Sequence, residues 1–279
     1  MMKQSVWSGY FLEKEPEEMI KIFAEMGFQY CELSYEHADM LIQRKGDLKN
    51  IGEAFGRYAR EQGIQLLQGH LPLRLKICQN TGDLEIMKQY LMLFDAIGVK
   101  YCVLHCDKFL EVPGLSKDEI FKRNLQALKE LEKFILNTEL VICLENLNIY
   151  PITAEELMKL LEELDEEHFG ICLDTGHLYM NQGDLLEFVK RAGRKILALH
   201  IADNEGKRDQ HMMPYGKGGI DFISVFRELK RIGYDGLYNL EIPGEVHAPF
   251  EVKLLKLEYI HKMMNVLDKL SAVREEVMV

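Results

Sequence analysis

Eight short, mostly apolar runs recur along this chain of 279 residues, and longer stretches with helical periodicity lie between them. The runs cover residues 4–7, 28–33, 64–70, 100–105, 140–145, 169–174, 196–201 and 237–241. Strands buried on both faces are apolar at nearly every position, and parallel sheets flanked by helices bury both faces. The alternation therefore predicts an α/β protein with a parallel sheet.

Glycines and capping residues mark the ends of the helical stretches. Gly27 and Gly98 each follow apolar residues at helical spacing, as a helix stop does. Residues 116–119 and 153–156 both have the form of a capping box, which begins a helix. Eight units average about 35 residues each, the size of one strand–helix repeat. Because no Pro/Gly/Ser-rich linker divides the chain, we expect a single domain over residues 1–279.

Two architectures accommodate eight such units: a closed (β/α)8 barrel, known as a TIM barrel, and an open doubly wound sheet. The open sheet more often carries a glycine-rich phosphate loop after its first strand. The corresponding segment here, SGYF at 8–11, is not such a loop. Since a (β/α)8 barrel needs about 250 residues, the length also suits the barrel. We therefore predict a parallel eight-stranded barrel.

Most of the apolar runs have an ionisable side chain of metal-ligand type at their last or second-last position. These side chains are Glu32, His70, His105, Glu145, Asp174, His200 and Glu241. In a barrel the carboxyl ends of all strands meet at one mouth, where active sites of this fold lie. Buried carboxylates and imidazoles are costly unless they are paired or bound to metal. The set predicts a site, although an ordinary ion pair would explain Glu32 alone.

Composition narrows the partners. The formal net charge is -11, with 34 Lys and Arg against 45 Asp and Glu, which disfavours binding to nucleic acid or to an anionic membrane. The sequence shows no uninterrupted apolar stretch of about 18 residues and no signal-peptide core. The 6 cysteines include no CxxC pair, so we expect a reduced, cytoplasmic protein. The oligomeric state, including a homo-oligomer, stays open.

Four segments carry a resemblance to a known family. They are LENLN at 144–148, CLDTGH at 172–177, HIADNEGKRDQHMMPYGKGGID at 200–221 and LEIPGE at 240–245. Their order along the chain resembles the xylose isomerase-like TIM barrel superfamily. That superfamily includes sugar isomerases and epimerases and also the endonuclease IV class of abasic-site nucleases (AP endonuclease family 2).

The epimerase branch implies one divalent metal ion held by four residues. Its pattern matches Glu145, Asp174, His200 and Glu241. Three carboxylates and one imidazole suit Mn²⁺ best, with Mg²⁺, Co²⁺ and Zn²⁺ as alternatives. The resemblance implies an isomerase or epimerase of a keto-sugar or sugar phosphate that works through an enediolate, with Glu145 and Glu241 as acid and base. A sugar lyase or dehydratase at the same metal site is an alternative.

The nuclease branch implies three zinc ions and additional ligands. Its pattern also maps onto His70, His105, His177, Asp209 and His211, all of which are present. The chain departs from the nuclease in reading HLPL at 70–73, where the nuclease has an aromatic residue, and in its few loop cations. We expect the additional residues to contact a small-molecule sugar rather than a second metal. A barrel that only binds a sugar or a protein is the third alternative.

Three further features are interpreted from the sequence alone. Trp7, the single tryptophan, ends the first run, where stacking on a sugar and core packing are equally compatible with it. The loop at 216–219, GKGG, suits either a phosphate or a tight turn. The remaining histidines fall in loops or helices and are expected at the surface; they are His37, His168, His247 and His261.

Overall fold

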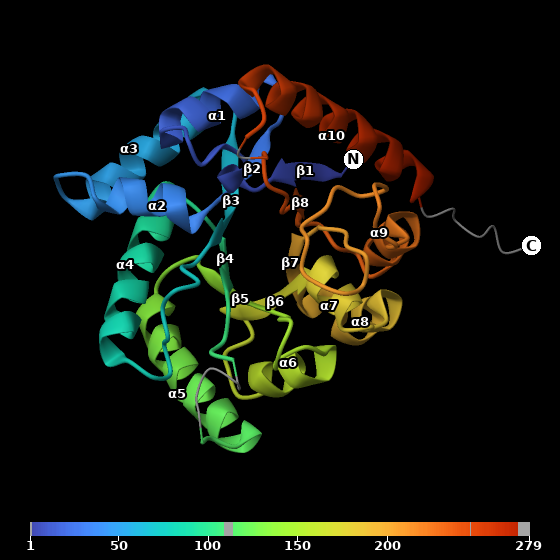
Figure 1. Ribbon diagram of the computed structural model, residues 1–279. Helices are drawn as coiled ribbons and strands as arrows, with labels where there is room; N and C mark the ends of the chain where they lie inside the picture. The colour runs from blue at the N-terminus through green and yellow to red at the C-terminus, as the bar shows by residue number, and fades with distance from the viewer. Residues whose placement is uncertain (1, 109–113, 246, 273–279) are drawn as a thin grey trace, which may run out of the picture.

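The computed structural model describes residues 2–108, 114–245 and 247–272. Parallel strands lie at its centre, and helices surround them (Figure 1). The strands are β1 (Lys3–Val6), β2 (Tyr30–Leu33), β3 (Gln65–His70), β4 (Tyr101–Leu104), β5 (Val141–Glu145), β6 (Phe169–Asp174), β7 (Ile196–His200) and β8 (Leu237–Leu240). Each predicted apolar run overlaps one of these strands.

The strands close into a barrel. Strands β2 to β7 form one parallel ladder in chain order, and β1 pairs in parallel with β8. Two single bridges join these sheets: Trp7 pairs with Glu32 between β1 and β2, and Ile201 pairs with Leu240 between β7 and β8. The Ile201 N–H also donates to the Asn239 carbonyl at 2.8 Å. The predicted (β/α)8 barrel is confirmed, and the open doubly wound sheet is wrong.

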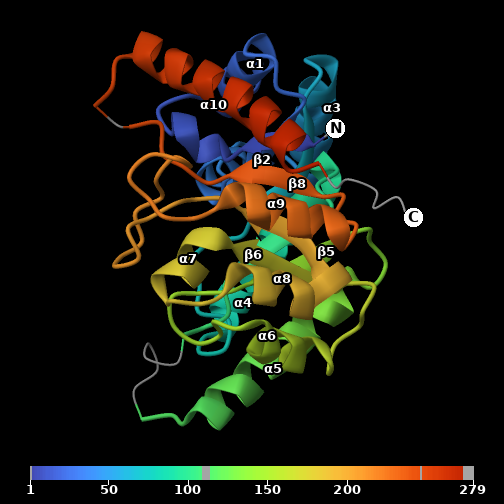
Figure 2. The same ribbon diagram turned by 90° about the vertical axis from the view of Figure 1, so that its right-hand side faces the viewer.

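Ten α-helices of the described residues pack around the strands. They are α1 (Pro16–Glu25), α2 (Tyr35–Ile42), α3 (Leu48–Glu61), α4 (Thr81–Ile97), α5 (Lys117–Ile135), α6 (Ala154–Leu161), α7 (Thr175–Met180), α8 (Leu185–Ala192), α9 (Phe222–Arg231) and α10 (Phe250–Leu270). Both views place α10 beside α1, so the last helix completes the ring next to the first (Figures 1 and 2).

The predicted helix ends are confirmed. Gly27 follows α1 with φ of 86°, and Gly98 caps α4 with φ of 93°, a left-handed conformation that glycine adopts without strain. Ser116 and Thr153 each accept a hydrogen bond from the backbone N–H of a glutamate three residues later, which completes both capping boxes. These local signals fix where the helices start and stop.

The two-residue repeat of a strand decides which side chains enter the barrel. One buried apolar cluster consists of Val103, Val141, Cys143, Cys172 and Ala198, all from central strands. Residues two positions further along a strand share the same face. Glu145, Asp174 and His200 lie two positions after members of this cluster, so they sit on its carboxyl-end side, at the mouth.

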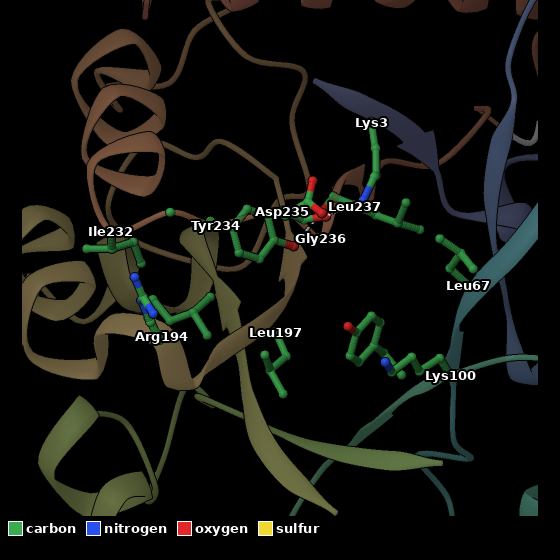
Figure 3. A pocket seen from close by; sticks show the side chains of 13 residues that line it. Lys3, Leu67, Lys100, Arg194, Leu197, Ile232, Tyr234, Asp235, Gly236 and Leu237 are labelled. Atoms are coloured by element: carbon green, nitrogen blue, oxygen red, sulfur yellow. Dashed lines mark hydrogen bonds and ion pairs between the residues drawn. The ribbon is translucent and has the colours of Figure 1, made fainter. Parts of the chain in front are cut away.

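A cavity of about 640 Å³ lies at the other end of the barrel, where the strands begin (Figure 3). Lys3, Tyr101, Ile196 and Leu237, the first residues of four strands, line it. Its Asp235 carboxylate is 2.9 Å from the Lys3 ammonium group. This cavity therefore lies at the opposite end of the barrel from the acidic mouth. None of the predicted metal ligands lines it.

Two of the four histidines expected at the surface are buried. The His37 ring lies on α2 with Nδ1 2.9 Å from the Ser8 hydroxyl, and His168 Nδ1 lies 2.9 Å from the Leu140 carbonyl oxygen. These hydrogen bonds satisfy the rings, which is why their burial is tolerated. Within the described ranges, no helix has the length and apolarity needed to cross a membrane.

The contact between α3 and α4 gives a test of the packing. A Cβ at Gly56 would lie 2.2 Å from the Ile97 carbonyl oxygen, a backbone atom that cannot move aside easily. We expect Gly56→Ala to lower the free energy of unfolding by about 1–3 kcal/mol, as overpacking does. Urea denaturation followed by circular dichroism measures this.

The control is Glu53→Ala on the exposed face of the same helix, which should change the stability by no more than about 0.5 kcal/mol. Equal midpoints for Gly56→Ala and the native chain would contradict the close approach of α3 to α4.

Candidate metal centre at the barrel mouth

Four predicted ligands converge at the carboxyl ends of four consecutive strands. Glu145, Asp174 and His200 are the last residues of β5, β6 and β7, and Glu241 directly follows β8. One ligand atom from each of the four lies within 4.8 Å of the others. The structure therefore brings together the four residues that the sequence predicted for a metal ion, which we call the metal group.

Three atoms of this group are buried and make no hydrogen bond among the described residues: Glu145 Oε1, Asp174 Oδ2 and His200 Nδ1. The nearest ring and carboxylate atoms are ion-pair neighbours, with His177 Nδ1 3.2 Å from Glu145 Oε1 and His200 Nδ1 3.2 Å from Glu145 Oε2. An unpartnered buried polar atom costs about 1–3 kcal/mol. Burial, followed by the charges of neighbouring carboxylates, raises the pKa of Glu241 above its ordinary value. A divalent cation would satisfy the three atoms and neutralise the carboxylates, so the residues fit such an ion.

A second layer of buried polar side chains holds His200. Its Nε2 lies 3.0 Å from Glu32 Oε2, and Glu32 is fully buried. The same oxygen accepts hydrogen bonds from the side-chain amides of Asn239, at 2.8 Å, and Gln68. Ser5 Oγ in turn donates to Asn239 Oδ1 at 2.8 Å. The Nε2–H of His200 donates to this carboxylate, so Nδ1 is the ring nitrogen that faces the other three candidate ligands.

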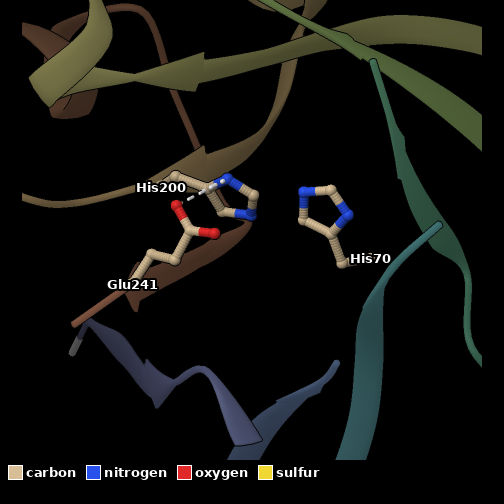
Figure 4. A group of neighbouring side chains, drawn as sticks. All are labelled: His70, His200 and Glu241. Carbon is tan, nitrogen blue, oxygen red and sulfur yellow. Dashed lines mark ion pairs between the residues drawn. The ribbon is translucent and has the colours of Figure 1, made fainter. Parts of the chain in front are cut away.

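Two histidines of the additional set surround Glu145. His105 Nε2 lies 2.9 Å from Glu145 Oε2, and His70 Nε2 lies 3.5 Å from the same oxygen. Burial lowers the pKa of His105 to about 4, so its ring is neutral at neutral pH. The His70 ring stacks on His200 with 5.2 Å between centroids and 16° between planes (Figure 4).

The other three residues of that set contact one another and also reach the first four ligands, since His177 Nδ1 lies 3.2 Å from Glu145 Oε1 and His211 Nδ1 lies 3.5 Å from Glu241 Oε2. His177 Nε2 and His211 Nε2 lie 3.1 Å and 3.2 Å from Asp209 Oδ2. Burial opposes the charge on His211, but the hydrogen bond to Asp209 and the nearby Glu241 carboxylate raise its pKa to about 10. The Asp209 and His211 side chains therefore meet, although His211 has a φ of 44° and the segment is not a strand there.

Two cavities of about 330 Å³ each open onto the mouth, and both are bordered by Glu241, His70, Asp209 and His211. The first is lined by Trp7, Tyr35, Glu36, Leu73, Gln210 and Pro243 in addition. The second is lined by Leu73, Leu75, Lys76, His105, Cys106, Asp107, Lys108, Glu145, Asn148 and His177 in addition. The catalytic candidates Glu145 and Glu241 therefore face space that a small molecule can enter.

The GKGG loop follows a turn at 214–215, and two of its glycines pack closely against neighbouring side chains. A Cβ at Gly218 would lie 2.0 Å from the Asp203 carboxyl carbon, and one at Gly219 would lie 2.2 Å from the Tyr179 hydroxyl oxygen. The Asp203 carboxylate accepts backbone N–H donors of Asn204 and Ile220. Close approach to these side chains explains the glycines, which favours the tight-turn interpretation over phosphate binding.

Sequence reasoning missed the layer beneath the ligands. From the sequence, Glu32 is attributed to an ordinary ion pair. In the structure its carboxylate contacts the candidate ligand His200 and the side-chain amides of Asn239 and Gln68. A signal was available, because Gln68 precedes His70 by two residues and Asn239 precedes Glu241 by two. In a strand that spacing places both amides on the face of the ligands.

Comparison with known proteins identifies the family. The model of the family described as xylose isomerase-like TIM barrel matches residues 20–262. The chain therefore belongs to the xylose isomerase-like TIM barrel family, as the four motifs implied.

Individual relatives and structures agree with this assignment. An uncharacterised protein of Methanocaldococcus jannaschii is 31% identical over 279 residues, covering 97% of this chain and 94% of the relative. A D-psicose 3-epimerase of Enterocloster bolteae is 24% identical over 252 residues, covering 84% of this chain and 79% of the relative. The solved D-psicose 3-epimerase of Clostridium cellulolyticum H10, with D-tagatose, superposes with a TM-score of 0.80 at 17% identity. It covers 95% of this chain and 99% of that one, a likeness that shows the fold.

The hydrogen bond between Glu32 and His200 gives a prediction for metal affinity. Glu32→Gln removes the negative charge that accepts the Nε2 proton, so the orientation and tautomer of His200 are held less firmly. We expect Mn²⁺ to bind about 10–100-fold more weakly, the usual effect of losing such a partner. Isothermal titration of the metal-free protein with Mn²⁺ measures this.

Glu18→Gln, an exposed substitution on α1, is the matched control and should leave the Mn²⁺ affinity unchanged. Circular dichroism establishes that both variants are folded. Native affinity in a folded Glu32→Gln variant would show that Glu32 does not support the metal group.

Proposed function

We propose that the protein is a metal-dependent isomerase or epimerase of a keto-sugar or sugar phosphate. One observation carries the proposal: four ligand atoms converge at the barrel mouth, and three polar atoms there have no hydrogen-bond partner in the described part of the chain. A relative named as a D-psicose 3-epimerase supports the reaction class. The cavities beside the group are of a size for a small molecule rather than a polymer.

Glu145, Asp174, His200 and Glu241 would hold the ion, with Mn²⁺ as our first choice. Three carboxylates and one imidazole are hard ligands, which Mn²⁺, Mg²⁺ and Co²⁺ prefer, whereas Zn²⁺ favours more nitrogen or sulfur. When bound, the ion supplies positive charge that acidifies the C–H beside the substrate carbonyl and stabilises the enediolate.

Glu145 and Glu241 would act as base and acid. They come from β5 and β8, on different sides of the barrel, so they approach a bound substrate from different directions. One carboxylate takes the proton from carbon, and the other, protonated, returns a proton to the opposite face, which inverts the centre. The side chain of Glu241 is 13% exposed and that of Glu145 is 1% exposed, so Glu241 is the more accessible of the two to incoming substrate.

Around this pair, the additional residues would grip the substrate. His177 and His211 donate from neighbouring elements into the same space, and Asp209 fixes both rings. Hydroxyl groups of a sugar both donate and accept, so an imidazole beside a carboxylate is a suitable partner for them. A lyase or dehydratase would use the same arrangement and differs in losing water, which product mass distinguishes.

A second candidate is a phosphodiesterase with three zinc ions. The observation in its favour is that His70, His105 and Glu145 form one further ligand group and His177, Asp209 and His211 form another. Zinc prefers such imidazole-rich groups. The net charge of -11 opposes the candidate, because a DNA duplex requires a basic surface.

The acid–base assignment predicts the effect of removing either carboxylate. We expect Glu145→Gln and Glu241→Gln each to lower kcat by about 10²–10⁴-fold, the usual contribution of a general acid or base, with a further loss if metal affinity falls. The assay is solvent-deuterium incorporation into a panel of ketoses, followed by NMR at saturating Mn²⁺.

Glu61→Gln, an exposed substitution at the end of α3, is the control and should keep native turnover. Turnover close to native in either active-site variant, on the substrate of the native protein, would refute the role of that glutamate.

The choice between the two candidates predicts a metal count and an absent activity. We expect about one Mn²⁺-like ion per chain by elemental analysis and no incision of an abasic-site duplex, because the acidic surface repels DNA. About three zinc ions per chain, together with incision at low enzyme concentration, would establish the phosphodiesterase instead.

A further inference from the structure

The cavity between Trp7 and Glu241 contains two polar atoms that the metal group does not explain. Trp7 Nε1 and Glu36 Oε2 are both buried and have no hydrogen-bond partner among the residues that the structure describes. Both side chains line the same 330 Å³ cavity, together with Tyr35 and Leu73. One atom is a donor and the other is an acceptor, which is what one or two hydroxyl groups of a ligand would satisfy.

The position of the indole is fixed by its surroundings. The Trp7 backbone N–H donates to the Leu240 carbonyl at 2.9 Å, and Trp7 also bridges Glu32 of β2. A Cβ at Gly9 would lie 2.3 Å from indole atom Cζ2, so the absence of a side chain there makes room for the ring. The indole is therefore held at the mouth by backbone pairing and by Gly9.

The charges around this cavity select for a neutral ligand. The carboxylates of Glu36, Asp209 and Glu241 all border it and outnumber the two imidazoles, His70 and His211. Gln210 and four aromatic or apolar side chains complete its walls. A phosphate with close to two negative charges would be repelled there, whereas a hydroxyl group donates to a carboxylate favourably.

The second cavity carries Lys76 and Lys108 on its walls, but acidic side chains again border it: Asp107, Glu145, Asp209 and Glu241. Lys108 Nζ already donates to Asn148 Oδ1 at 3.1 Å. Neither cavity is therefore built around an excess of positive charge.

We infer that Trp7 and Glu36 form a subsite for the hydroxylated end of an unphosphorylated keto-sugar, and that Glu36 selects against the phosphate ester. This inference rests on the proposed function, because it assumes that the reacting carbons lie at Glu241. The Glu36 carboxylate accepts from a sugar hydroxyl, and the Trp7 Nε1–H donates to one. The substrate then spans the distance from this subsite to the metal group.

The single tryptophan of the chain makes the subsite directly observable, since all tryptophan fluorescence comes from Trp7. The probes are D-psicose, D-tagatose, L-ribulose, L-ribulose 5-phosphate and inorganic phosphate, each titrated into the Mg²⁺-loaded protein. We expect a saturable change with at least one free ketose. We also expect L-ribulose to bind at least about tenfold more tightly than its 5-phosphate, the factor that corresponds to losing one charge-assisted hydrogen bond.

Glu36→Gln is the decisive variant because it keeps the shape and removes the charge. We expect it to weaken binding of the free ketose about tenfold. The ratio of the affinity for L-ribulose to the affinity for L-ribulose 5-phosphate should fall as a result. Trp7→Phe, measured by calorimetry, should also weaken ketose binding, since it keeps a ring and removes the N–H. Glu61→Gln is the control and should bind every probe as the native protein does.

The outcomes separate the two proposals. One outcome is a ketose-dependent change in Trp7 fluorescence that Glu36→Gln weakens, without turnover of any ketose. That outcome would support the subsite and refute the proposed isomerase or epimerase activity. If the native protein turns over a ketose, and the Glu36→Gln variant has the same KM and the same fluorescence change with that ketose, the subsite is overturned and the proposed function stands. Tighter binding of L-ribulose 5-phosphate than of L-ribulose by the native protein would also overturn the inference.

Discussion

Placing three carboxylates within reach of one another at the end of a closed barrel is the constraint on which the rest of the site depends. Parallel strands bring Glu145, Asp174 and Glu241 to one mouth, and burial raises the pKa of Asp174 and Glu241. Such a group is costly by itself. The histidines around it, and the cation that its unpartnered atoms would bind, are what make the arrangement tolerable.

The barrel interior supports this group in layers. Small apolar side chains such as Cys143 and Ala198 fill the lower part, where no polar atom needs a partner. Above them, Ser5, Asn239 and Glu32 form a chain of hydrogen bonds that ends on His200. The apolar layer excludes water, and the polar layer fixes the orientation of a ring. The orientation of a candidate metal ligand in this barrel therefore depends on the polar side chains beneath it.

The fold was predictable because its signals are local and repeat along the chain. Apolar runs, capping boxes and helix-stop glycines each identify one element. Their number is compatible with a closed barrel and with an open sheet, and the chain length and the segment at 8–11 favoured the barrel. The convergence of the candidate ligands was predictable because they lie at strand ends. The role of Glu32 was not, because its partner His200 is 168 residues away in the sequence and the contact exists only after closure. The burial of His37 was missed for the same reason, since Ser8 belongs to another element.

The pairing of β1 with β8 also governs the order in which the molecule can assemble. Strands β2 to β7 are neighbours in chain order and can add one after another as the polypeptide is synthesised. Strand β1 is synthesised long before its partner strand Leu237–Leu240. The backbone groups of β1 that pair with β8 therefore stay unpaired until β8 has been made. Bringing these distant segments together carries the largest loop-closure entropy in the fold. Glu241 follows β8 directly, so the last candidate ligand reaches the mouth only when the barrel closes. Under the proposed function, binding of the metal ion would therefore report completed folding.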